Sequence, residues 1–295
     1  MIKRICEIPS PSGGEERLKE FIVNELENFT DLYFEDTFGN LIFIKKGEEK
    51  RVCVECGIDE PFLMVAESDN ENLRFSAPPH IKASDFADKD VCFADQSSCL
   101  VESEKEEDIK FCHLFASFEG EKETGECVTL LPYFKRNEKT FSAFNIRYKT
   151  PLYVLINAIK SIKENTNELY FVFSVQKCLA NRGVRALMQS GIEFDKAICI
   201  SCISEKEEGV SIIAKEKSCI PTPEIRKELL SLARENEISV RVGITEDNFN
   251  MKTYLTEGLG APCGLICIPC TENSVSVNDI KTAEKLITAL CEKRS

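Results

Sequence analysis

Polar and thiol side chains follow the ends of four predicted strands. The strands cover residues 52–56, 169–175, 197–200 and 265–269, which are short apolar runs rich in β-branched residues. Because ligands bind at the carboxyl ends of strands in open α/β sheets, these ends are the places where chemistry is expected. The residues there are Gly57, Asp59, Glu60, Gln176, Lys177, Cys178, Ser201, Cys202, Cys270, Glu272, Asn273 and Ser274, with Asn145 and Arg147 in the loop before a predicted helix.

Thiols are one possible source of chemistry at these ends. Cys178, Cys202 and Cys270 could bind zinc or an iron–sulfur cluster as thiolates. The C-x-x-C pairs 199/202 and 267/270 lie mostly within strands, however, so the two Cys of each pair should point to opposite faces. The chain has 15 Cys in all, an odd number. Reduced Cys acting as small buried apolar residues are therefore favoured, and a thiolate site stays an alternative.

Histidine is scarce. The only two, His80 and His113, lie in the middle third of the chain, far in sequence from every predicted strand end. A His-ligated zinc site at those ends is therefore excluded by counting.

Charge and hydropathy limit the possible partners and compartment. The net charge of -13 makes nucleic acid a poor partner, because an acidic surface repels phosphate backbones. No apolar run is long enough for a membrane span, so no membrane partner is expected. The first residues lack the apolar stretch of a signal peptide. These features predict a cytoplasmic protein.

The patterning changes twice along the chain. Residues 66–139 combine short strands with frequent turns and show no helix period, which predicts a small inserted β-barrel-like domain. After residue 140, predicted helices at 151–163, 183–190, 223–236 and 279–291 alternate with apolar strands, which indicates a mostly parallel sheet covered on both faces. Residues 1–65 and 140–295 should therefore form one α/β domain.

The first long helix has a recognisable start signal. Ser12 followed three residues later by Glu15 fits a capping box, in which each side chain satisfies an amide of the first turn. Leu18, Phe21 and Ile22 then lie on one helical face.

Six segments in order resemble the M42 family of dinuclear-metal aminopeptidases. They are residues 9–15 (PSPSGGE), 36–41 (DTFGNL), 57–65 (GIDEPFLMV), 142–147 (SAFNIR), 170–178 (YFVFSVQKC) and 266–269 (ICIP). The resemblance runs across nearly the whole chain and includes the β insertion. It implies a three-layer α/β/α domain of the zinc-exopeptidase, phosphorylase/hydrolase-like type with an inserted small β-rich domain. It also implies a homo-oligomer, since family members build large shells.

The family's metal-binding positions carry other residues here. Active members bind two metal ions with two His and several carboxylates, and one Glu acts as the general base. By resemblance, the first His position is Gly57, the bridging Asp is Asn145, the base Glu is Lys177, the ligand Glu is Cys178, the ligand Asp is Ser201 and the last His falls near Ser274. Asp59, which orients the centre in relatives, is kept.

These replacements remove the chemistry of a metal pair. Two cations about 3.5–4 Å apart need anionic ligands to offset their repulsion. Gly57 offers no ligand and Lys177 puts a positive charge where a base should accept a proton. No metal or other cofactor is therefore expected.

Three functions follow as alternatives. The favoured one is a family homologue without dinuclear-metal peptidase activity, which binds a peptide or assembles with itself or with an active relative. The second is an active or repurposed metallo-hydrolase that uses zinc or iron on thiolates. The third is an active aminopeptidase with ligands among the other carboxylates, which are Asp59, Glu60, Glu246, Asp247 and Glu272. Glu60, Arg147 and Glu272 are the further cleft candidates, and Arg147 is expected to pair with a carboxylate.

Overall fold

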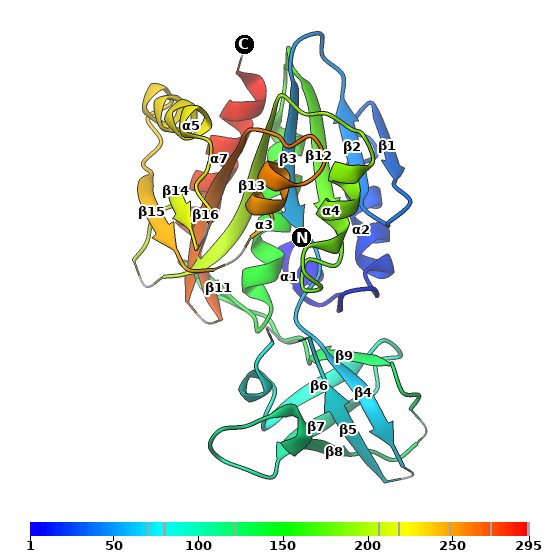
Figure 1. The fold of residues 1–295 in the computed structure, drawn as a ribbon. Helices are drawn as coiled ribbons and strands as arrows, with labels where there is room; N and C mark the ends of the chain where they lie inside the picture. The colour runs from blue at the N-terminus through cyan, green and yellow to red at the C-terminus, as the bar shows by residue number, and fades with distance from the viewer. Residues whose placement is uncertain are drawn as a thin grey trace.

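The computed structural model of the protein describes residues 1–69, 71–78, 81–120, 122–205, 207–217, 219–247, 249–271 and 273–293. His80 and Glu272 lie outside the described residues. The described residues form an eleven-stranded mixed sheet covered by helices, and a closed barrel that leaves the sheet after its strand β3 (Figure 1). This arrangement confirms the predicted three-layer α/β/α fold with a β-rich insertion.

Four parallel strands form the centre of the main sheet. In spatial order they are β12 (Glu168–Ser174), β3 (Arg51–Gly57), β13 (Lys196–Ser204) and β16 (Cys263–Thr271). Gly57 pairs with Ser174, and Ser201 pairs with Cys267. Because the strands run in the same direction, their carboxyl ends meet at one edge of the sheet.

Antiparallel strands extend this centre on both sides. On one side lie β2 (Leu41–Lys45) and β1 (Leu32–Glu35), and on the other lie β17 (Ser274–Ser276), β11 (Thr140–Ser142) and β10 (Lys135–Arg136). A branch from β16 consists of β14 (Ser211–Glu216) and β15 (Arg241–Thr245).

Helices cover both faces of the sheet. One apolar cluster includes side chains of α1 (Ile2–Cys6), α2 (Glu16–Leu26), α3 (Ile146–Ser161), α5 (Pro223–Glu235) and α7 (Val277–Glu292). A second cluster includes those of α4 (Arg182–Gln189) and α6 (Met251–Thr256). Alternate residues of β13 divide between them: Ile198 and Ile200 belong to the first cluster and Cys199 to the second. Each fully buried Leu or Ile stabilises these layers by roughly 1.5–3 kcal/mol.

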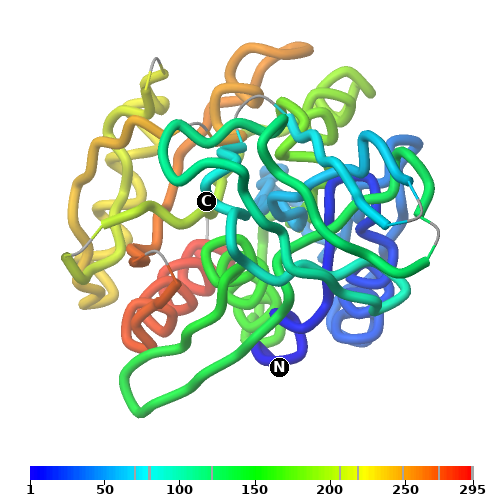
Figure 2. Tube along the Cα trace, turned by 90° about the horizontal axis from the view of Figure 1, so that it is seen from below, coloured from blue at the N-terminus to red at the C-terminus, as the bar shows by residue number. Residues whose placement is uncertain are grey.

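The barrel has its own apolar core. Its strands, in order around the barrel, are β4 (Leu63–Ser68), β5 (Asn72–Ser76), β8 (Leu114–Ser117), β7 (Ser98–Ser103), β6 (Lys89–Phe93) and β9 (Cys127–Leu130), with short 3-10 turns η1 (Ala83–Asp85) and η2 (Phe111–His113). Phe62, Phe75 and Phe93 are among its buried side chains. Seen from below, the barrel trace in cyan and green lies across the end of the α/β domain (Figure 2).

The bounds of the insertion differ from the predicted 66–139. The first barrel strand begins at Leu63, and the last ends at Leu130. Strand β10 pairs with β11, which pairs with β17, so both extend the main sheet. The turn-rich composition of this region cannot distinguish an outer hairpin of the main sheet from a barrel strand. Among the residues described, no helix is both long and apolar enough to cross a membrane.

The predicted capping box is wrong. Helix α2 begins after Glu15, whose side chain makes no cap hydrogen bond. Ser12 Oγ instead donates to Asp59 Oδ2 at 2.5 Å, and Glu15 accepts the backbone N–H groups of Gly13 and Gln176 at 2.8 and 2.9 Å. Both side chains therefore connect the N-terminal loop to the strand ends, a long-range role that a local motif cannot reveal.

Candidate functional site

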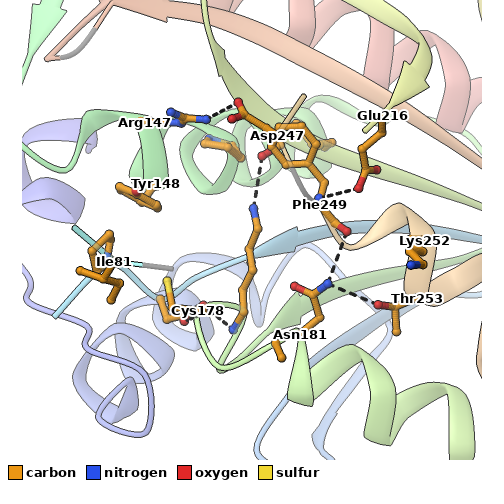
Figure 3. A pocket seen from close by; sticks show the side chains of 18 of the residues that line it. Ile81, Arg147, Tyr148, Cys178, Asn181, Glu216, Asp247, Phe249, Lys252 and Thr253 are labelled. Carbon is orange, nitrogen blue, oxygen red and sulfur yellow. Dashed lines mark hydrogen bonds and ion pairs between the residues drawn. The ribbon is translucent and has the colours of Figure 1, made fainter. Parts of the chain in front are cut away.

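A cleft of about 700 Å³ lies where the carboxyl ends of β3, β12 and β13 approach the barrel (Figure 3). Gly57 is the last residue of β3, Lys177 follows the end of β12, and Ser201 lies near the carboxyl end of β13, which continues to Ser204. The barrel contributes residues around η1, and the segment from Glu246 to Thr253 contributes the opposite side. The cleft is thus at the edge that the strand-end rule selected from sequence.

Lys177 crosses this cleft. Its Nζ donates a hydrogen bond to Ser201 Oγ at 3.2 Å and lies 5.3 Å from the centre of the Phe249 ring. Its aliphatic stem covers Gly57: a Cβ atom placed on that glycine would lie 2.7 Å from Lys177 Cδ. The glycine and the lysine are therefore sterically complementary, because one leaves the space that the other fills.

The glycine–lysine fit predicts non-additive effects on stability. Gly57→Ala should lower the free energy of unfolding by about 1 kcal/mol, since the added methyl group must displace the lysine stem. In a Lys177→Ala background most of this loss should disappear, which gives a coupling of about 0.5–1 kcal/mol. Urea unfolding of the wild type, both single variants and the double variant measures it. Additive losses would contradict the fit.

Asp59 holds the loop that carries Lys177. It is buried, and its Oδ1 accepts the backbone N–H of Lys177 at 2.9 Å while its Oδ2 accepts that of Cys178 at 2.8 Å. With the hydroxyl of Ser12 also donating to Oδ2, both carboxylate oxygens are engaged. The buried Glu15 supports the same loop, and burial raises its pKa to about 7 with help from the nearby Asp59 charge. Asp59 is thus a positioning residue.

Glu60 does not line the cleft, contrary to its prediction as a cleft candidate. It is buried behind the strand ends, where its Oε1 lies 3.2 Å from Lys149 Nζ of α3 and accepts the Ser10 N–H at 2.8 Å. Lys149 also donates to the Ile8 carbonyl and to Ser10 Oγ. The pair is therefore a buried structural ion pair, and Lys149 was not identified from sequence.

Two of the predicted ligand positions point elsewhere. Asn145 Nδ2 donates to the Cys6 carbonyl of α1 at 3.0 Å, and Asn145 is absent from the lining of the cleft. Ser274 Oγ accepts from Ser142 Oγ at 3.3 Å and lines a separate cavity beside β11 and β17. The structure therefore brings together Gly57, Lys177, Cys178 and Ser201 but neither of these two.

The three candidate thiols lie in two environments. Cys178 lines the cleft, whereas Cys202 and Cys270 belong to the apolar cluster on the α3 face of the sheet. As predicted, the Cys of each C-x-x-C pair face opposite ways, because Cys199 and Cys267 belong to the other cluster. Burial raises the pKa of Cys178 and of Cys202 well above the usual value, so both favour the neutral thiol.

Charged side chains opposite Lys177 complete the cleft. Arg147 pairs with Asp247 at 2.5 Å (Figure 3), as expected for an arginine beside a carboxylate, and also donates to Ser204 Oγ at 2.7 Å. Glu216, the last residue of β14, accepts the Phe249 N–H at 2.7 Å. Burial raises the pKa of Glu216 to about 7. The strand-end rule would select Glu216 as a site residue, but it requires strand β14, which the sequence pattern does not predict.

The strand ends of this cleft present a donor set that does not fit a pair of metal ions, while Glu216, Glu246 and Asp247 line the cleft elsewhere. The three strand ends present a glycine, an ammonium group and a hydroxyl, and the buried Asp59 oxygens are already engaged. Within the described part of the chain, no group of three or more His, Cys, Asp or Glu side chains could hold a metal ion.

Comparisons with known proteins agree with the fold. The family model described as M42 glutamyl aminopeptidase matches residues 123–287. A protein of Acetivibrio thermocellus named "Putative aminopeptidase" is 29% identical over 324 residues, which cover 99% of this chain and 98% of that protein.

Solved structures of aminopeptidases match this fold. An aminopeptidase of the archaeon Desulfurococcus kamchatkensis matches with a TM-score of 0.92 at 17% identity, covering 99% of this chain and 94% of its own. The Pyrococcus horikoshii TET1 peptidase, which can assemble into a tetrahedron or a large octahedral shell, matches with a TM-score of 0.88 at 21% identity, covering 99% and 98%. Because the family model covers more than half of the sequence, this chain belongs to the M42 glutamyl aminopeptidase family.

Proposed function

We propose that this chain keeps the M42 fold but does not hydrolyse peptides with a dinuclear metal centre. It binds a peptide-like ligand in its cleft and assembles with itself or with an active relative. The observation that carries the proposal is Lys177, whose stem fills the space beside Gly57 and whose ammonium group donates to Ser201.

Electrostatics supports this proposal. A metal pair requires bridging and terminal anions because the two cations repel each other. An ammonium group at the same strand ends adds positive charge and accepts no proton from a metal-bound water. The compact fit between Lys177 and Gly57 also leaves no room for an additional ligand side chain at position 57.

Metal content tests the proposal directly. The protein, purified without chelator or His-tag and then incubated with excess Zn²⁺ or Co²⁺ and desalted, should retain far less than one ion per chain by elemental mass spectrometry. It should also fail to hydrolyse aminoacyl-p-nitroanilide substrates. Two retained ions, with hydrolysis that a chelator abolishes, would overturn the proposal. About one zinc or several irons per chain, lost in Cys202→Ser or Cys270→Ser, would favour the thiolate alternative instead.

Two variants test whether the cleft ammonium group alone prevents metal binding. Lys177→Met removes the cleft ammonium, and Lys227→Met on the exposed face of α5 removes the same charge far from the cleft. Neither should gain two ions, because the remaining donors do not form a metal-binding group in the described part of the chain.

Assembly is the second part of the proposal. Shell formation by the TET1 relative supports a homo-oligomer here, since the two folds agree over 99% of this chain. The mass of the same purified sample in solution should be that of a multimer. A monomer at micromolar concentration would remove this part and leave the metal result unaffected.

A further inference from the structure

Among the described residues, the ammonium group of Lys177 forms no ion pair. Its hydrogen-bond partner is the neutral hydroxyl of Ser201, and its other close neighbour is the Phe249 ring. Among the described residues, no carboxylate forms an ion pair with it, although the side chain is partly withdrawn from solvent. A partly desolvated cation with a single neutral acceptor retains donors for an anion.

Glu216 has the complementary property. Its side chain is 1% exposed and lines the same cleft, and its Oε1 accepts the Phe249 N–H at 2.7 Å. In the described part of the chain, its Oε2 has no hydrogen-bond partner. Buried polar atoms are nearly always hydrogen-bonded, so this oxygen indicates a missing partner.

Phe249 places these two groups beside each other. Its ring lies under the Lys177 ammonium group, and its backbone N–H contacts Glu216. Of the other charged side chains of the cleft, Arg147 pairs with Asp247, and Glu246 pairs with Lys215 at 3.2 Å, while Lys82 and Lys252 also line it. Lys177 and Glu216 are therefore a donor and an acceptor with unused hydrogen-bonding capacity, and both contact the same aromatic residue.

The surrounding charges select the kind of anion. The cleft is lined by five carboxylates and four cationic side chains, and the chain carries a net charge of -13; the carboxylates are Asp59, Asp85, Glu216, Glu246 and Asp247, and the cations are Lys82, Arg147, Lys177 and Lys252. A phosphate dianion would add to the small excess of negative charge, whereas an amino acid or a peptide brings an ammonium group together with its carboxylate and adds no net charge. Ile81, Pro61 and Tyr148 add apolar surface for a side chain of the ligand.

We propose that the cleft binds the α-carboxylate of an amino acid or of the C-terminal residue of a short peptide. Lys177 Nζ donates to the carboxylate. Glu216 turns its Oε2, which is closed off from solvent in this structure, toward the cleft and accepts an N–H of the same ligand, which is the ammonium group of an amino acid or a peptide amide. This inference rests on the proposed function, because a metal pair at the strand ends would displace Lys177.

Calorimetric titration of the full-length, metal-free protein tests the carboxylate contact. The probes are Leu-Gly-Gly, its C-terminal amide, free leucine and inorganic phosphate. The amide should bind at least about 10-fold more weakly than the acid, as expected for the loss of one charge-assisted hydrogen bond. Phosphate should not compete. Tighter binding of leucine than of the tripeptide identifies a free amino acid as the ligand, and the reverse identifies a peptide.

Variants test whether Lys177 causes the tighter binding of the acid than of its amide. Lys177→Met should bind acid and amide equally, while the matched charge loss Lys227→Met should keep the wild-type preference. Glu216→Gln should weaken binding of both probes and keep their ratio. Equal binding of acid and amide by the wild type, or a preserved ratio in Lys177→Met, would overturn the inference, as would no binding at millimolar concentration. Each of these leaves the metal measurement unaffected, and only the absence of all binding would also remove the peptide-binding part of the proposed function.

Discussion

Glu60→Ala should lower the free energy of unfolding by about 3–5 kcal/mol, because it leaves the Lys149 charge unpaired in the interior. The Lys149 side chain is fully buried and that of Glu60 is 4% exposed, with 3.2 Å between Nζ and Oε1. The variant also removes the acceptor of the Ser10 N–H. Unfolding in urea, followed by circular dichroism, measures the loss.

Two comparisons decide whether burial of the charge is the cause. Glu104→Ala breaks the surface ion pair between Glu104 and Arg74, in which both side chains are nearly half exposed. This variant should lower the free energy of unfolding by less than about 1 kcal/mol. The double variant Glu60→Leu with Lys149→Met should recover most of the loss, because no unpaired charge stays inside. A cost for Glu60→Ala as small as that for Glu104→Ala would show that Lys149 reaches water or another partner.

The large-scale organisation was predictable from periodicity. Alternating apolar strands and helices after residue 140 required a covered parallel sheet, and the short strands and turns before it indicated the barrel. The division of β13 between two apolar clusters was equally predictable, since successive strand residues face opposite ways. These properties follow from local sequence, which is why they could be read without coordinates.

The start of helix α3 was not predictable in the same way. Pro151 is typical of a first helical turn, and the helix was expected to begin there. The N–H groups of Tyr148 and Lys149 already donate to the Asn145 carbonyl, so α3 begins at Ile146 with the proline inside it. Lys149 is consequently a buried residue of α3, which a helix beginning at Pro151 does not predict.

Side-chain direction at the site could not be predicted either. Asn145 donates to a carbonyl of α1, and the sequence pattern does not predict this five-residue helix. Glu216 ends β14, whose Ile212 and Ile213 are an apolar run too short to identify a strand. The strand-end rule would have selected Glu216 if this strand had been recognised, so the failure lies in the element and not in the rule.

The stability of the wild type relative to Glu216→Gln should fall as pH rises from about 5 to 8. Burial raises the pKa of Glu216 from 4.5 to about 7, while the Phe249 N–H and the charges of Lys177 and Lys252 oppose the shift and Asp247 adds to it. The folded chain therefore holds this proton at a pH where the unfolded chain has released it. The stabilisation is complete below about pH 4.5 and is lost as pH rises through about 7.

The difference in the free energy of unfolding between the wild type and Glu216→Gln should change by about 3 kcal/mol over this pH range. This magnitude follows from the size of the pKa shift. Glu15 titrates in the same window, because burial raises its pKa to about 7 as well. Subtracting Glu216→Gln from the wild type at each pH cancels that contribution, since both proteins keep Glu15. Urea unfolding at several pH values measures the difference, and Glu246→Gln controls for the loss of one exposed negative charge in the same cleft.

The pH dependence of stability also tests the proposed contact between Glu216 and the ligand. A Glu216 that ionises near neutral pH becomes a better acceptor for an ammonium or amide N–H as the protein loses stability, so binding and titration are linked. A bound amino acid should then reduce the pH slope of the wild type and leave that of Glu216→Gln unchanged. A difference between the two proteins that stays constant from pH 5 to 8 would mean that Glu216 is already ionised in the folded chain, paired with a donor that reaches its second oxygen.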